Sequence, residues 1–455
     1  MYKKRREILQ NTVGSGILLF LGNSESPMNY ADNQYHFRQD STFLYYFGFN
    51  KNADIAAVID IDNNREIIFG DELTIDSIVW TGLLPTIKEQ ANSICVNETL
   101  PLLSLNSFIK DAVKMGRKVH YLPPYRAEHK LKLTELLDIH PLAQDAGKSV
   151  EFIKAVVNQR NYKSVEEIAE IEKAVNISYD MHLAAMKGAR AGMKEYEIKS
   201  IIQSVAQSNG GELSFPIIST VHGETLHNHN YENTLKEGQM LLIDAGAELP
   251  NGYCGDLSST IPVGKRFTDR QKIIYEIVYK SHYAAVAALK PGISFKEVYY
   301  LACRTIFNGL KEIGLTKGDA NEAVLAGANA LFFQCGLGHM MGLDVHDMEN
   351  LGEVWVGYNG VPKSTQFGIK SLRLARDLEP GFVLTIEPGI YFIPTLIEKW
   401  KTENRFSEFI NYREVEKWID FGGIRNEEDY LITPTGHRIL GTPISKKIED
   451  VEAMR

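Results

Sequence analysis

The sequence predicts an α/β protein of two domains. Its 455 residues exceed what one hydrophobic core usually organises. In the first 145 residues, apolar runs of strand length alternate with a helical stretch at residues 126–137, which is the pattern of an α/β domain. After Ser164 the apolar residues instead keep a long helical period. We therefore expect a first domain over residues 1–155 and a second over residues 160–455.

Individual elements follow from the same patterns. The expected strands of the first domain are residues 17–21, 56–61 and 66–69, which are apolar and bounded by turn residues. The long helix of the second domain begins with a capping box, because Ser164 is followed three residues later by Glu167. Further helices are expected over residues 195–208, 269–289 and 294–313, and a polar loop over residues 357–365.

The composition excludes several classes of protein. A formal net charge of -9 does not supply the clustered cations of a nucleic-acid-binding face, and the basic run at residues 3–6 is expected to be a solvated helix face. No apolar run approaches the roughly 20 residues that span a bilayer, and the run at residues 16–22 is too short for a signal peptide. The four cysteines form no Cys-x-x-Cys pair, which suits reduced thiols. We expect a cytoplasmic protein without nucleic-acid or membrane partners.

Carboxylates stand where purely structural strands would keep apolar residues. The run at residues 240–243 leads into Asp244, and the run at residues 382–386 leads into Glu387. A third run, residues 423–432, contains several acidic residues. Burying a carboxylate costs several kcal/mol unless it is paired, hydrogen-bonded or bound to a metal. Three such runs therefore predict a bound cation.

Strand alternation decides which acidic residues of the third run face the cation. Side chains alternate between the two faces of a strand. Arg425, Glu427 and Asp429 should therefore share one face, and Asn426 and Glu428 the other. This favours Glu427 over Glu428 as a ligand.

A hairpin and two histidines extend the candidate site. Asp256 lies twelve residues after Asp244, a distance at which a hairpin can bring both carboxylates together. His339 and His346 stand seven residues apart in a glycine-rich segment, although either histidine alone is more often a core residue. The spacing lacks a His-Glu-x-x-His motif and thiolate pairs, so it is not a zinc signature. Carboxylates with one imidazole favour a hard to borderline ion such as manganese, with cobalt or zinc as replacements.

Five segments in chain order resemble the motifs of the pita-bread metallopeptidases. They are LIDAG at residues 242–246, GDLSST at 255–260, GLGH with DVHD within 336–347, TIEPGIY at 385–391 and GGIRNEED at 422–429. Residues 5–6, 29–32 and 37–49 are similar to the first domain of the proline-specific branch, which comprises aminopeptidase P and prolidase. The resemblance implies an aminopeptidase-P-type α/β domain followed by a catalytic domain with a curved, mainly antiparallel sheet covered by helices.

The resemblance also implies two divalent metal ions and a role for each motif residue. The metal ligands would be Asp244, Asp256, His339, Glu387 and Glu427, with Asp256 and Glu427 bridging the two ions. Glu387 would also act as general base toward the water that bridges the metals, and the resulting hydroxide would attack the peptide.

Other positions would face the substrate or support the ligands. By resemblance, His227 steadies the substrate and the tetrahedral intermediate, and His346 stands near the scissile carbonyl. Arg425 would hold Asp256 or Glu427 in place.

Three further positions bear on substrate preference. Cys335 replaces a family histidine near the proline pocket and is interpreted as a small apolar side chain. Arg373 matches the prolidase arginine that receives a dipeptide carboxylate, or is a surface arginine. Phe215 is a candidate pocket wall, with ordinary core packing as the alternative.

The implied activity is metal-dependent release of the N-terminal residue from peptides with proline in second position. Prolidase, which cleaves Xaa-Pro dipeptides, is the alternative, because residues 371–376 and 404–421 look more like that enzyme. A non-catalytic pita-bread protein that binds peptides is a third possibility, which the intact acidic set argues against. By resemblance, the first domain contributes to a subunit interface and shapes the cleft, so a homodimer or higher homo-oligomer is expected.

Overall fold

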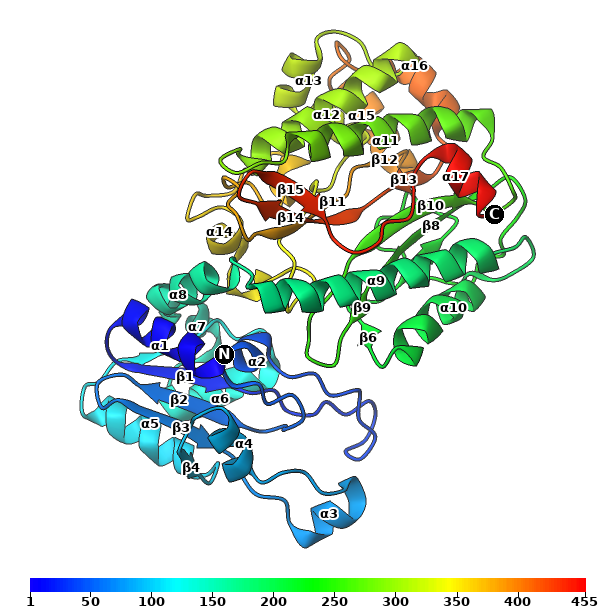
Figure 1. Cartoon of the computed structure of the whole chain (residues 1–455). Coiled ribbons are helices and arrows are strands. Elements are labelled where there is room, and N and C mark those ends of the chain that lie inside the picture. The colour runs from blue at the N-terminus through cyan, green and yellow to red at the C-terminus, as the bar shows by residue number, and fades with distance from the viewer. The chain divides into compact units, whose positions relative to one another are not determined.

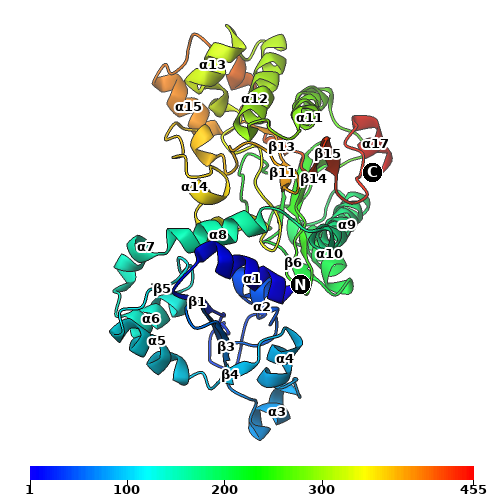
Figure 2. The same cartoon turned by 60° about the vertical axis from the view of Figure 1, so that its left-hand side comes forward.

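A computed structural model describes all 455 residues, and these form two compact units (Figures 1 and 2). Unit 1 comprises Met1–Arg160 together with Met348–Trp355, and unit 2 comprises Asn161–Asp347 and Val356–Arg455. Unit 1 is therefore discontinuous in sequence, because a short segment from far along the chain belongs to it.

Unit 1 is built on a mixed sheet of five strands in the order β4-β3-β2-β1-β5. The strands are β1 (Ile17–Leu21), β2 (Ala56–Asp60), β3 (Arg65–Phe69), β4 (Glu98–Leu100) and β5 (Val119–His120). β2 pairs antiparallel with β1 and β3, whereas β5 and β4 add in parallel at the two edges. The three strands expected in this part of the sequence correspond to β1, β2 and β3.

Helices and short turns complete unit 1. They are α1 (Tyr2–Val13), α2 (Ser41–Phe47), α3 (Ile75–Thr81), α4 (Ile87–Ser93), α5 (Ser104–Lys114), α6 (Ala127–Leu137), η1 (Pro141–Ala143), α7 (Gln144–Gly147), α8 (Val150–Arg160), η3 (Glu349–Leu351) and most of α14 (Glu353–Val356). Apolar side chains of β1, β2 and β3 pack with those of α5 and α6 into a buried core. The late segment Met348–Trp355 contacts α8, where the Lys154 ammonium lies 4.9 Å from the centroid of the Trp355 ring.

The basic run in α1 is not simply a solvated face, so that expectation was wrong. Arg6 is completely buried, and its guanidinium donates hydrogen bonds to Glu66 and to the carbonyl oxygens of Tyr46 and Ile94. Arg5 is also buried, with its guanidinium carbon 3.7 Å from the centroid of the Tyr45 ring. A planar guanidinium can satisfy several acceptors at once, which a count of charges along the sequence does not reveal.

Unit 2 holds its strands between two layers of helices (Figure 1). On one side lie α9 (Val165–Gly188) and α10 (Glu195–Ser208), and on the other lie α11 (Asp269–Ala288) and α12 (Phe295–Glu312). The predicted capping box is present, since Ser164 accepts from the Glu167 backbone and the Glu167 carboxylate accepts from the Ser164 backbone. The four long helices expected from the sequence are therefore found within one or two residues of their predicted limits.

The strands of unit 2 pair only in antiparallel fashion. They form the sheets β10-β8-β7 (Leu257–Pro262, Met240–Ala245, Ile218–Thr220), β11-β14-β15 (Val383–Ile386, Glu428–Thr433, Gly436–Ile439), β12-β13 (Gly389–Tyr391, Gly423–Arg425) and β6-β9 (Glu212–Leu213, Ala247–Glu248). The remaining short elements are α13 (Ala320–Ala326), η2 (Ala328–Leu331), η4 (Ile369–Ser371), α15 (Pro394–Thr402), α16 (Tyr412–Val415), η5 (Glu416–Trp418) and α17 (Ile448–Ala453). None of the helices combines the length and apolar character that a membrane span requires.

The acidic run at residues 423–432 forms two strands rather than the single strand that was expected. β13 ends at Arg425 and β14 begins at Glu428, and between them the Glu427 backbone N–H donates to the Ser258 carbonyl. The chain thus changes partner from β12 to β11 at this point. Glu428 lies against His282 and Tyr430, so the alternation predicted for Glu427 and Glu428 survives the break.

One buried ion pair closes the end of β2. Asp60 is fully buried, and both of its carboxylate oxygens accept from the Arg117 guanidinium, with 2.9 Å between Nη1 and Oδ2. Asn63 donates a further hydrogen bond of 2.9 Å to Oδ2. Burial raises the pKa of Asp60, but the hydrogen bonds from Arg117 and Asn63 outweigh burial and leave the pKa below its ordinary value.

We expect Arg117→Met to lower the free energy of unfolding of unit 1 by about 2–3 kcal/mol at pH 7, somewhat less than for a fully buried pair because Arg117 is partly exposed. A lowered folded-state pKa stabilises the protein above the unfolded value, near 4, and this contribution disappears as the pH falls through the folded-state pKa. Urea unfolding of wild type and variant should therefore begin to converge below about pH 4 and should coincide once the pH is below the folded-state pKa of Asp60.

Arg438→Met is the matched control. It removes the more exposed pair with Glu172 and should cost at most about 1 kcal/mol. Equal costs for the two variants would contradict the importance of the Asp60 pair.

Candidate metal centre

A cavity of about 220 Å³ lies in unit 2 and gathers most of the predicted site residues. All five predicted metal ligands line it, namely Asp244, Asp256, His339, Glu387 and Glu427. The rest of the lining consists of the predicted residues Phe215, His227, Cys335, His346 and Arg425, together with Pro216, Ile218, Leu226, His229 and Val345. Arg373 is the one predicted site residue outside this lining.

Strand ends bring the carboxylates together. Asp244 is near the end of β8, and Asp256 immediately precedes β10, which pairs with β8 so that Ser258 stands opposite Asp244. Glu387 lies between β11 and β12, and Glu427 between β13 and β14. The expected hairpin geometry of Asp244 and Asp256 is therefore present.

Backbone pairing with β11 fixes the position of His339. The Thr385 N–H donates to the His339 carbonyl, and the Glu387 N–H donates to the Leu337 carbonyl. The approach is so close that a Cβ on Gly338 would lie 2.0 Å from the Thr385 carbonyl oxygen, so only glycine fits there. His339 is thereby fixed beside Glu387.

The imidazole of His339 is oriented toward the carboxylates. Its Nδ1 is 3.0 Å from the Met340 carbonyl oxygen, so the N–H is directed to the backbone. The other nitrogen, Nε2, is 3.3 Å from Asp256 Oδ2 and 3.8 Å from Glu387 Oε1. A backbone acceptor on one ring nitrogen is the usual arrangement that leaves the other free for a metal.

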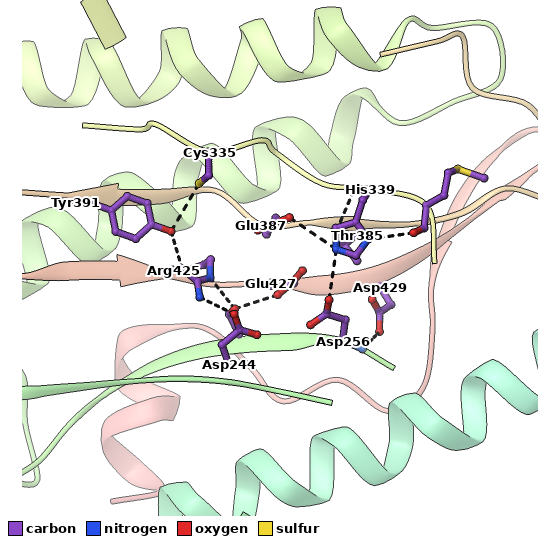
Figure 3. Close-up of polar contacts among 12 residues, drawn as sticks. Asp244, Asp256, Cys335, His339, Thr385, Glu387, Tyr391, Arg425, Glu427 and Asp429 are labelled. Carbon is purple, nitrogen blue, oxygen red and sulfur yellow. Dashed lines mark hydrogen bonds and ion pairs between the residues drawn. The ribbon is translucent and has the colours of Figure 1, made fainter. Parts of the chain in front are cut away.

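Arg425 joins several groups on the opposite side of the cavity (Figure 3). Its Nη2 donates to Asp244 Oδ2 at 2.5 Å and its Nη1 donates to the Tyr391 hydroxyl at 2.9 Å. Arg425 has no direct hydrogen bond or ion pair with Asp256 or Glu427. Its direct carboxylate partner is Asp244, and it reaches Glu427 through Ser258, which accepts from Nε and donates to Glu427 Oε2.

Burial and mutual repulsion oppose ionisation of the carboxylates. Burial raises the pKa values of Asp256 and Glu427 well above their ordinary range, and repulsion from neighbouring carboxylates adds to this effect. Burial raises the pKa of Glu387 to about 7, although Arg425 acts against the increase. Burial, with the neighbouring His346, lowers the pKa of His339 well below its ordinary value. The site therefore favours a neutral imidazole and requires added positive charge to keep its carboxylates ionised.

The donor atoms fit divalent cations. Oδ1 of Asp244 and Oδ1 of Asp256 are buried and accept no hydrogen bond. One donor atom from each of Asp256, His339 and Glu427 lies within 4.8 Å of the other two. Buried carboxylate oxygens that accept no hydrogen bond destabilise the fold unless a cation binds them. Carboxylate oxygens with one imidazole nitrogen suit a hard to borderline divalent ion.

Of the two residues predicted to bear on substrate preference, Cys335 lines the cavity and Arg373 does not. Cys335 Sγ is 3.9 Å from the Tyr391 hydroxyl, and burial raises the pKa of this thiol to about 12, which argues for a neutral side chain. Arg373 is half-buried, and its charge, after burial and the charge of Arg425, contributes to lowering the pKa of His227.

Sequence reasoning missed two residues that contact Glu427 or Arg425 and several that line the cavity. Ser258 lies two residues after Asp256, so strand alternation could have placed both on one face. Tyr391 belongs to the segment TIEPGIY, but nothing in that segment indicates that its hydroxyl accepts from Arg425. The apolar lining residues Ile218, Leu226 and Val345 have no distinguishing pattern in the sequence.

Comparisons with known proteins extend over nearly the whole chain. The family model described as metallopeptidase family M24 matches residues 169–434, and the model described as aminopeptidase P, N-terminal domain, matches residues 2–121. The Xaa-Pro aminopeptidase of Escherichia coli (strain K12) is 30% identical over 100% of this chain and 97% of that protein. The Xaa-Pro dipeptidase of Homo sapiens is 29% identical over 97% of this chain and 89% of that protein.

Solved structures agree with these sequence matches. A zinc-substituted aminopeptidase P of E. coli in complex with product has a TM-score of 0.80 and 29% identity, covering 100% of this chain and 98% of that chain. Proline aminopeptidase P II from Yersinia pestis has a TM-score of 0.80 and 27% identity, with the same coverage. The predicted family and the predicted two-part α/β fold are confirmed. The chain belongs to metallopeptidase family M24 and carries an N-terminal domain of the aminopeptidase P type.

Proposed function

We propose that this metallopeptidase removes the N-terminal residue from peptides whose second residue is proline. The observation that carries the proposal is the convergence of three buried carboxylates, the partly buried carboxylate of Glu387 and one imidazole on a cavity with an apolar wall. Similarity to the E. coli Xaa-Pro aminopeptidase along the full chain supports this choice of substrate.

The metal ligands in this proposal are Asp244, Asp256, His339, Glu387 and Glu427, which would hold two divalent ions. When bound, such ions lower the pKa of a water molecule and polarise the substrate carbonyl. Manganese is the proposed ion, with cobalt or zinc as replacements, because the donors are oxygens and one nitrogen without thiolates.

Side chains of the cavity supply the remaining functions. Glu387 serves as general base, because its carboxylate lines the cavity among the other proposed ligands, where it would accept a proton from the attacking water. His227 and His346 line the cavity and would donate hydrogen bonds to the substrate carbonyl oxygen. Phe215, together with Ile218, would pack against the pyrrolidine ring of the substrate's proline. Proline has no backbone N–H, so an apolar wall leaves no donor of this residue without a partner.

Prolidase activity is the second candidate. The feature that favours it is the half-buried Arg373, which does not line the cavity but whose charge contributes to the pKa shifts of His227, His339 and Glu387. A guanidinium can bind the carboxylate of a dipeptide with two parallel hydrogen bonds. The human Xaa-Pro dipeptidase is as similar to the chain as the bacterial aminopeptidase.

We further propose that residues 1–155 form an oligomerisation and cleft-shaping domain and residues 160–455 the catalytic domain. The first of these carries a strongly exposed apolar surface on and beside α3, which consists of Ile75, Val79, Trp80 and Leu83. Apolar patches of this kind mark interaction sites, and a second copy of the chain is the proposed partner, giving a homodimer. None of the four cysteines forms a disulfide, which supports a reducing, cytoplasmic location.

A comparison of substrates tests the activity. With manganese present, we expect cleavage of Xaa-Pro-Yaa peptides with a free N-terminus, measured by mass spectrometry of the released residue. Glu387→Gln should lower kcat by at least about 10²–10⁴-fold, because ligand and general base are lost together. Cleavage of dipeptides alone would select prolidase, and cleavage of neither class would exclude both enzymes.

Replacement of Arg373 separates the two activities further. Arg373→Met should raise KM for Xaa-Pro dipeptides about 10–100-fold, the loss expected for a charged hydrogen bond of about 1.5–3 kcal/mol, and should affect longer peptides much less. Lys370→Met removes an exposed charge three residues away and serves as the control. Equal KM changes for dipeptides and longer peptides would exclude carboxylate recognition by Arg373.

Removal of metal should destabilise the protein, because repulsion among the buried carboxylates is then uncompensated. Calorimetry should show a lower Tm with chelator and recovery on adding Mn²⁺, which stabilises by about 2.7 kcal/mol at 100 times its Kd. The double variant Asp244→Asn, Asp256→Asn should lose this response. A Tm independent of metal in the wild-type protein would contradict the proposed ligands.

A further inference from the structure

A hydroxyl on β10 connects two carboxylates of the candidate metal centre. Ser258 is completely buried, and its Oγ lies 2.9 Å from both Arg425 Nε and Glu427 Oε2. Arg425 in turn donates to Asp244 Oδ2. A continuous relay therefore runs from Asp244 through Arg425 and Ser258 to Glu427.

The direction of this relay is fixed by the chemistry of its members. A guanidinium can only donate hydrogen bonds, so Ser258 must accept from Arg425. The single hydrogen of the hydroxyl is then available for Glu427 Oε2, which accepts it. The serine thus holds the guanidinium on one side and the carboxylate on the other.

Backbone contacts prevent the serine from shifting. Its carbonyl oxygen accepts from the Glu427 N–H at 3.0 Å and from the buried Lys446 ammonium at 2.9 Å. Thr260 lies two residues after Ser258 on the same face of β10. Its hydroxyl accepts from the Arg425 N–H at 3.1 Å and donates to the Arg425 carbonyl at 3.0 Å. The backbone on both sides of Asn426 is therefore tied to β10.

We propose that Ser258 is a positioning residue for the metal centre. It does not line the cavity, so it acts through Glu427 and Arg425, whose orientation toward the cations it sets. The inference rests on the proposed role of Asp244 and Glu427 as ligands, and it adds a requirement for one particular hydroxyl. Groups that orient metal ligands commonly contribute 10–100-fold to metal affinity.

The neighbouring serine provides a matched control. Ser259 is on the same strand and equally buried, but its hydroxyl contacts the Lys446 ammonium at 2.9 Å and His182 Nδ1 at 3.0 Å. Neither of these groups lines the cavity. Loss of either serine hydroxyl removes similar polar contacts from the interior, but only Ser258 contacts Glu427 and Arg425.

Titration calorimetry of the metal-free full-length protein with MnCl₂ tests the proposal. Ser258→Ala should weaken at least one Mn²⁺ affinity about 10–100-fold, whereas Ser259→Ala should stay within about threefold of wild type. Ser258→Thr, which keeps the hydroxyl, should restore the affinity. Metal content after dialysis provides a second measurement that does not depend on activity.

Several outcomes would overturn the proposal. Unchanged affinity in Ser258→Ala, an equal loss in Ser259→Ala, or no Mn²⁺ binding by the wild-type protein would each do so. If Ser258→Ala does not fold by circular dichroism, Ser258→Cys keeps the side-chain size with a weaker donor and should show the same loss of affinity. A wild-type protein that binds two Mn²⁺ ions but cleaves no Xaa-Pro peptide would reject the proposed activity and leave the serine comparison valid.

Discussion

Repulsion among four carboxylates, three of them buried and one partly buried, is the constraint on which the organisation of unit 2 depends. Asp244, Asp256, Glu387 and Glu427 share one cavity, and Arg425 is the only arginine or lysine that lines it. One guanidinium cannot balance four negative charges in a region of low dielectric constant. Divalent cations would supply the missing charge, so folding and metal binding are expected to be thermodynamically coupled.

The antiparallel sheets meet this constraint by placing the four carboxylates at the ends of different strands. Each carboxylate comes from the end of a different strand, so no single element contains more than one of the repelling groups. Arg425 then connects β13 to β8, to β10 through Ser258 and to β12 through Tyr391. One side chain therefore links strands from separate sheets at the point where their charges meet.

Local signals in the sequence predicted the elements and the acidic set. The capping box at Ser164 and the carboxylates that follow apolar runs depend on neighbours in the chain, and these features appear as predicted. Three other features depend on residues far away in sequence. They are the burial of Arg6, the pairing of Arg425 with Asp244, and the split of the acidic run at Glu427. Such contacts leave no local pattern, because a buried polar group needs a partner only after the fold brings one near.

The late segment Met348–Trp355 has a consequence for biosynthesis. Because it belongs to unit 1, the chain passes between the two units three times, at residues 160, 347 and 355. Unit 1 cannot be completed on the ribosome when residue 160 emerges, since Lys154 still lacks the Trp355 ring that it covers in the finished fold. Its assembly must wait until most of unit 2 has been translated, including the loop that carries His339 and His346.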